Sequence, residues 1–192
     1  MKISNKLLIA GFVLTALAQI AVPAKMMYDC EMTERHGTEY KFRTRPIDPT
    51  DPFRGKYITL YFDNTVYVKD TIWTGERDAY VYIANDADGF AKVTNVSYSR
   101  IDSKKDHFKA KVWGYNGMLH IDLPFDRYYM EEGKAYEAEL AYRDYSRGDS
   151  LKKPAYAVVA IKDGHSVLKD VIVDGKPIRD YVLEQREIKK YK

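Results

Sequence analysis

The sequence predicts a mainly β protein, in which an antiparallel β-sandwich or barrel-like domain follows an N-terminal transmembrane or signal helix. Three observations lead to this fold class. An uncharged apolar segment occupies residues 7–24. Beyond it, polar and apolar residues alternate with a period of two, as expected for half-buried strands. Dipeptides suited to tight hairpin turns separate the alternating runs. The 192 residues have room for one such domain and one appendage.

The apolar segment has the composition of a membrane helix. Its length lies at the lower end of the roughly 17 to 25 residues that cross a bilayer. Lys2 and Lys6 precede it, which predicts that the N-terminus stays in the cytoplasm and that the rest of the chain is exported. A signal peptide has a shorter apolar region of about 7 to 15 residues, so the length favours an anchor retained in the lipid bilayer. The small residues at 22–24 leave cleavage after Ala24 open.

We therefore divide the chain into three parts. Residues 1–24 form the transmembrane anchor or signal segment. Residues 25–37 form a juxtamembrane helix, because they tolerate helix and stop at Gly37. Residues 38–192 form the exported β-domain.

Alternation and turn residues predict the strands of this domain. In the run 107–114, Phe108 and Val112 share one face and Lys109 and Lys111 the other. The run 135–144 alternates in the same way. We expect strands at residues 39–45, 56–68, 79–84, 90–98, 107–114, 118–123, 135–144, 155–162 and 167–173. Turn dipeptides lie at Asp88-Gly89, Asn116-Gly117, Asp163-Gly164 and Asp174-Gly175.

Composition argues against several classes of function. Beyond residue 24 the chain carries 29 basic residues, the 31 of the whole chain less Lys2 and Lys6, against 28 acidic ones. Without a basic excess, we expect no nucleic-acid partner. Cys30 is the only cysteine, so an internal disulfide and a thiolate metal cluster are excluded. The four histidines lack ligand spacing and suit solvent-facing or turn positions, so we expect no metal site. No glycine-rich phosphate loop follows a strand, so we expect no cofactor.

The seventeen tyrosines fall largely in or beside the predicted strands. Tyrosine suits half-buried sheet positions when its hydroxyl finds a partner. It is also enriched at protein interfaces. We assign most of these tyrosines to packing and a few exposed rings to contact with a partner.

Residues 45–55 form a stiff extended connector before the strand at 56–68. Asp48 and Asp51 are suited to accept amide hydrogen bonds in a turn, and Arg54 to pair with one of them. Gly55 permits a turn or a close backbone approach. Three prolines fix the backbone φ angle: Pro46, Pro49 and Pro52.

The stretch "DPFRGKYITLYF", residues 51–62, resembles the signature of the GDYXXLXY family. Gly55, Tyr57 and Leu60 match this signature, whereas Lys56 stands where the family has aspartate and Phe62 where it has the last tyrosine. Residues 127–140 and 157–178 resemble later blocks of the family. The resemblance implies a protein of the bacterial cytoplasmic membrane, with its C-terminal domain extracytoplasmic, that associates with a polytopic membrane protein.

The leading hypothesis is a non-catalytic accessory protein that docks on such a partner through the connector and strand. Its expected binding residues are Asp48, Asp51, Phe53, Arg54, Gly55, Tyr57, Leu60 and Tyr61. A signal-peptidase-like hydrolase is an alternative, although Pro46 stands roughly where its nucleophilic serine would be needed. An extracytoplasmic sensor of a ligand or carbohydrate is another, since aromatic strands can stack on sugars.

Overall fold

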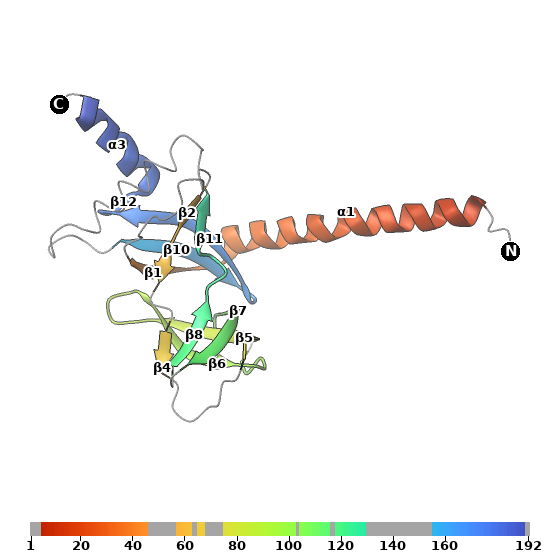
Figure 1. Cartoon of the computed structure of the whole chain (residues 1–192), viewed down its shortest axis with the longest axis horizontal. Helices are drawn as coiled ribbons and strands as arrows, with labels where there is room; N and C mark the ends of the chain where they lie inside the picture. The colour runs from red at the N-terminus through yellow and green to blue at the C-terminus, as the bar shows by residue number, and fades with distance from the viewer. Residues whose placement is uncertain are drawn as a thin grey trace.

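The predicted fold class is confirmed: a computed structural model shows a mainly β, antiparallel body with one long N-terminal helix (Figure 1). The structure describes residues 5–45, 57–62, 65–67, 75–102, 104–115, 118–129 and 155–190. Two five-stranded sheets and one two-stranded sheet make up the body in this part of the chain.

Helix α1 (Asn5–His36) projects away from the β-rich body for most of its length (Figure 1). Its most apolar 18-residue window has a mean hydropathy of 2.1, and none of that window is buried. The exposed fraction is 74% for Phe12 and 71% for Leu14. One continuous helix thus covers the predicted apolar segment and the predicted juxtamembrane helix. It is long and apolar enough to cross a membrane, a property that signal sequences share.

The C-terminal end of α1 packs against strands β10 (Tyr156–Lys162) and β11 (His165–Val173). Thr33 is 1% exposed there. The helix ends because the Gly37 N–H donates to the Thr33 carbonyl at 2.8 Å and the chain turns into β1 (Thr38–Arg45). A Cβ atom at position 37 would lie 2.5 Å from the Thr33 carbonyl oxygen, so this junction requires glycine.

The first large sheet has the strand order β12-β11-β10-β1-β3 and is antiparallel. Two of the predicted turns connect its strands. Asp163 and Gly164 have φ angles of 49° and 89°, and Asp174 and Gly175 have 54° and 78°. Positive φ at both central residues is the geometry of a two-residue hairpin turn. The two remaining strands of the first large sheet are β3 (Tyr61–Phe62) and β12 (Lys176–Pro177).

The second large sheet has the strand order β4-β8-β7-β5-β6. The predicted alternation of β7 is confirmed: Phe108 and Val112 are buried, whereas Lys109 and Lys111 are exposed. Its strands are β4 (Thr65–Tyr67), β5 (Arg77–Asn85), β6 (Ala91–Ser97), β7 (His107–Tyr115) and β8 (Met118–Asp122).

The prediction of one strand at 56–68 is wrong, because three short strands in three different sheets replace it. β2 (Tyr57–Thr59) pairs with β9 (Arg127–Tyr129), β3 pairs with β1, and β4 pairs with β8. Between β2 and β3, Leu60 is 2% exposed and its N–H donates to the Asp126 carbonyl at 2.7 Å. The segment therefore crosses between sheets, and no single ladder can continue along it.

Seven of the other predicted strands are confirmed to within two residues at either end. The predicted strand at 135–144 lies outside the described residues. Strands β9 and β12 were not predicted, and helix α3 (Ile178–Lys190) follows β12.

Four buried phenylalanines join the two large sheets. Phe42 lies on β1, Phe62 on β3 and Phe108 on β7. Phe125 follows β8, and its ring centroid lies 4.9, 5.4 and 5.6 Å from those of Phe42, Phe108 and Phe62 respectively. Such edge and tilted ring pairs add specific packing energy to the burial of the rings. The core therefore lies between the sheets, with Phe125 at its centre.

Arg43 of β1 holds the β5–β6 hairpin against the first sheet. Its guanidinium nitrogens bind the carboxylates of Asp86 at 3.0 Å and Asp88 at 2.8 Å. Its guanidinium also lies 4.1 Å from the centroid of the Phe90 ring. The hydrogen bond from the Phe90 N–H, together with Arg43, lowers the pKa of Asp86. Gly89 completes this predicted turn with a φ angle of 79°.

Candidate binding site around strand β2

The structure describes three of the eight predicted binding residues. Asp48, Asp51, Phe53, Arg54 and Gly55 lie outside the described residues. The others are Tyr57, Leu60 and Tyr61.

These three residues belong to different structural environments. Tyr57 of β2 pairs with Tyr129 of β9, whereas Tyr61 of β3 pairs with Arg45 of β1. Leu60, between them, is part of the hydrophobic core. The described end of the signature stretch, residues 57–62, therefore connects sheets, and its leucine contributes to packing.

Next to β2 lies a buried tyrosine paired with a carboxylate. Tyr128 of β9 is opposite Ile58 and is 4% exposed. Its hydroxyl donates to Asp170 Oδ1 of β11 at 3.0 Å, and the Arg179 guanidinium lies 5.6 Å from the centroid of its ring. Burial, followed by the charge of Asp170 and the hydrogen bond to it, raises the pKa of Tyr128 to about 12, although Arg179 opposes this shift. The pair fixes β9, and through it β2, against the first sheet.

A β-bulge in β11 places Asp170 where Tyr128 can reach it. Val158 pairs with Asp170 and Val159 with Leu168, so Lys169 is an extra residue in the ladder. The Lys169 amine binds Glu39 Oε1 of β1 at 2.6 Å. The consecutive residues Lys169 and Asp170 thus contact different strands, β1 and β9, because a bulge changes the direction in which side chains leave a strand.

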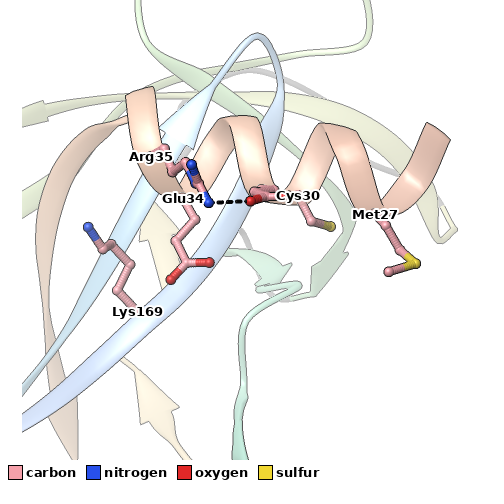
Figure 2. Close-up of a pocket in the computed structure, with 6 residues that line it drawn as sticks. Met27, Cys30, Glu34, Arg35 and Lys169 are labelled. Atoms are coloured by element: carbon pink, nitrogen blue, oxygen red, sulfur yellow. Dashed lines mark ion pairs between the residues drawn. The ribbon is translucent and has the colours of Figure 1, made fainter. Parts of the chain in front are cut away.

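A shallow hollow lies where α1 meets β11 (Figure 2). It has a volume of about 630 Å³. Arg35 pairs with Glu31 along the helix at 2.5 Å, and the hydrogen bond to Glu39 raises the pKa of Lys169. The Arg35–Glu31 pair is exposed and the Lys169–Glu39 pair is partly exposed, so each contributes little to stability. The residues that line the hollow are Met27, Cys30, Glu31, Glu34, Arg35 and Lys169.

A second tyrosine–carboxylate pair joins the two large sheets. The Tyr40 hydroxyl of β1 donates to Asp106 Oδ2, just before β7, at 2.8 Å. Burial, followed by the hydrogen bond and charge of Asp106, raises the pKa of Tyr40 to about 12. A neutral tyrosine is required in each pair, because a tyrosinate would lose its donated proton and face a carboxylate.

We expect these two pairs to make the protein sensitive to alkali. Their folded pKa values of about 12 lie above the ordinary value of 10.0. Because folding favours the protonated form, the stabilisation is complete below about pH 10 and is lost as the pH rises toward about 12. Urea unfolding followed by circular dichroism at several alkaline pH values measures this loss.

The double variant Tyr40→Phe, Tyr128→Phe provides the control for the alkaline loss. It should be less stable near neutral pH, since each carboxylate loses a hydrogen-bond donor. Its stability should fall less steeply than that of the parent between about pH 10 and 12. Equal slopes for the two proteins would contradict the assignment.

The expectation that the histidines face solvent or occupy turns is wrong for His107. Only 3% of this residue is exposed. Its ring nitrogen Nδ1 lies 2.9 Å from the Lys105 carbonyl oxygen, and the ring contacts Tyr82 at a centroid distance of 5.3 Å. The Tyr82 hydroxyl accepts the Ile101 N–H at 2.7 Å. The backbone at Ile101 is thus held against β5 of the second sheet.

Across the described residues, no group of three or more histidine, cysteine, aspartate or glutamate side chains is arranged to hold a metal ion. The tyrosine–carboxylate pairs were not predicted. Their partners lie 66 and 42 residues apart along the chain, so no local pattern identifies them. The prediction that buried tyrosine hydroxyls find partners holds for Tyr40, Tyr82 and Tyr128.

Fold and site together define a class of protein: an antiparallel β-domain attached directly to a long, exposed apolar helix. Within this class, the chain belongs to the GDYXXLXY protein family, whose sequence profile matches residues 19–171. The resemblance seen in the sequence is therefore confirmed over most of the chain. Searches among curated proteins and among solved structures returned no match.

Proposed function

We propose that this protein is a non-catalytic accessory protein of the cytoplasmic membrane, anchored by α1, with its β-domain outside the cytoplasm and docked on a polytopic membrane partner. The observation that carries the proposal is the continuity of α1, which runs from an exposed apolar segment into the packed base of the domain without a break.

The dimensions of α1 suit an anchor. At about 1.5 Å per residue, residues 7–24 extend about 27 Å, close to the roughly 30 Å of a hydrocarbon core. Residues 25–36 add about 18 Å and hold the domain near the headgroup region. Lys2 and Lys6 favour a cytoplasmic N-terminus. The Gly37 junction then presents the domain to a partner in a restricted orientation.

The β2–β9 pair is the surface that we propose for docking. Tyr129 of β9 is 62% exposed and lies opposite Tyr57 of the signature stretch. Its neighbour Tyr128 is held by Asp170, so the strand is already ordered before a partner binds. A strand that is ordered before a partner binds loses less conformational entropy on association. Exposed tyrosine on a preordered strand is typical of protein interfaces.

Fractionation of cells that express the full chain with a C-terminal tag tests the anchor. We expect the protein to remain in the membrane after alkaline carbonate washing, with an intact mass, and its tag to be digested by protease added outside the cytoplasmic membrane. A soluble product that begins at Lys25 would show instead that the apolar segment is a cleaved signal peptide. A tag accessible only from the cytoplasm would contradict the orientation.

Site-specific photocrosslinking in intact cells tests the docking surface. A photoreactive amino acid at Tyr129 should capture a polytopic membrane protein. The matched control is Tyr115 on β7, which is also 62% exposed but lies on the second large sheet. Capture from Tyr129 and not from Tyr115 supports docking through β2–β9. Absence of a membrane-protein adduct at Tyr129 would contradict it.

A further inference from the structure

A groove crosses the outer face of the second large sheet. This is the face on which Lys109 and Lys111 of β7 are exposed, opposite the buried Phe108 and Val112. The volume of the groove is about 630 Å³. Residues from β5, β7 and β8 form it together with the segments that follow β6 and β8. The lining residues are Asp78, Ala79, Tyr80, Tyr98, Lys109, Ala110, Lys111, Asp122, Leu123 and Pro124.

The charges in this groove balance one another. The lining includes two lysines and two aspartates. Lys111 binds Glu76 Oε1 at 2.5 Å, and this bond, with smaller contributions from Asp78 and Asp122, raises the Lys111 pKa. A groove lined by equal numbers of lysines and aspartates presents little net field to attract a charged ligand. It does present both hydrogen-bond donors and hydrogen-bond acceptors.

Aromatic rings accompany these polar groups on the same face. Tyr98 lines the groove and is 43% exposed, and the Arg77 guanidinium lies 5.6 Å from the centroid of its ring. The Lys109 nitrogen lies 5.6 Å from the centroid of the Tyr80 ring, its neighbour across β5 and β7. Beyond Lys111 on β7, Trp113 is 37% exposed and stacks on His120 of β8, with ring centroids 4.1 Å apart and an angle of 11° between the planes.

The sheet geometry places Trp113 within reach of a ligand that occupies the groove. Residues two apart on a strand lie on the same face, about 7 Å from each other. Trp113 is two residues from Lys111, and His120 is two residues from Asp122. The stacked pair therefore extends the groove along β7 and β8. Tyr98 follows β6 and lies by Arg77 of β5, which is opposite Val112, so a ligand that crosses the sheet between β6 and β8 can contact both Tyr98 and Trp113.

We infer that this groove, extended by Trp113, binds an uncharged carbohydrate chain. Sugar rings combine an apolar C–H face, which aromatic rings can cover, with hydroxyls that both donate and accept hydrogen bonds. Arg77 lies over the Tyr98 ring and His120 stacks on the Trp113 ring, so each ring presents its other face to the ligand. The charged side chains between them provide donors and acceptors. This site is separate from the β2–β9 docking surface and does not depend on the proposed function.

Calorimetric titration of the full chain tests this inference. The protein is held in a zwitterionic detergent without a sugar headgroup, since a glycoside detergent would compete for the groove. The probes are chitohexaose, cellohexaose and maltohexaose. At least one of them should bind with a millimolar or tighter dissociation constant. Tyr98→Ala and Trp113→Ala should each weaken that binding by up to about tenfold, the loss expected for one aromatic contact.

Two control variants separate ring stacking from a structural effect. Trp113→Phe keeps a ring and should retain most of the affinity. Tyr28→Ala removes a 62% exposed tyrosine from α1, outside the groove, and should bind as the parent does. Absence of binding by all three oligosaccharides would overturn the inference, as would equal affinity in Tyr98→Ala, Trp113→Ala and parent. Binding of anionic polygalacturonate without binding of a neutral probe would overturn the assignment of ligand class.

Discussion

Phe108→Ala should lower the free energy of unfolding by about 3 to 5 kcal/mol, the usual cost of truncating a fully buried phenylalanine. Phe108 is 0% exposed on β7, and its ring contacts those of Phe42 on β1, at 6.4 Å, and Phe125, at 5.4 Å. The substitution leaves a cavity where the two large sheets meet, and rings held from several sides cannot move to fill it. Urea unfolding of the detergent-solubilised full chain measures the change.

Two further substitutions on β7 calibrate this result. Tyr115→Ala removes another aromatic ring from the same strand, but that residue is 62% exposed, so the change should be within about 0.5 kcal/mol of zero. Phe108→Leu keeps most of the apolar volume and should give an intermediate loss. A Phe108→Ala loss as small as that of Tyr115→Ala would mean that the phenylalanines do not join the sheets.

Gly37→Ala should destabilise the base of the domain by about 1 to 3 kcal/mol, the range for forcing extra atoms into a packed site. The added Cβ would lie 2.5 Å from the Thr33 carbonyl oxygen, 3.0 Å from the Ile161 backbone nitrogen and 3.1 Å from the Ile161 carbonyl oxygen. These are backbone atoms, so no side-chain rotation relieves the contact. Helix α1 must then shift relative to β10. The unfolding transition of the full chain in detergent should move to lower urea concentration.

Gly11→Ala is the matched control within the same helix. No atom lies within 4 Å of a Cβ built at Gly11. Alanine favours helix over glycine by about 1 kcal/mol, so this variant should be neutral or slightly stabilised. Limited trypsin digestion adds a local measurement, because opening of the junction in Gly37→Ala should accelerate cleavage after Arg35. Equal stability and equal cleavage in the two variants would contradict a steric role for Gly37.

Much of the fold could be predicted because it is encoded locally. The alternation of Phe108 and Val112 with Lys109 and Lys111 predicts a strand with one buried face, and β7 has that face. Asp163-Gly164 predicts a hairpin because these residues tolerate positive φ, and the turn between β10 and β11 has it. The uncharged run at 7–24 predicts a helix that the domain does not bury, and α1 stands exposed there.

The candidate site around β2 could be predicted only in part, because it depends on contacts between residues that are distant along the chain. Periodicity at 56–68 indicates extended backbone but not the strand with which each part pairs, and three partners divide the segment into β2, β3 and β4. The sequence predicts that Tyr128 lies in a sheet, but no local sequence pattern predicts that Asp170 accepts the hydrogen bond from its hydroxyl. That contact depends on the extra residue at Lys169, which the ladder between β10 and β11 accommodates.

By itself, the sequence determined the long apolar helix, the mainly antiparallel body, the positions of most strands and membership of the GDYXXLXY family. Each depends on interactions between residues close along the chain, or on a linear match of residues. Only the tertiary structure decided that Leu60 is core, that His107 is buried, and that tyrosine–carboxylate pairs join separate strands. These features require groups distant along the chain to meet, and the packing of the sheets determines which of them do.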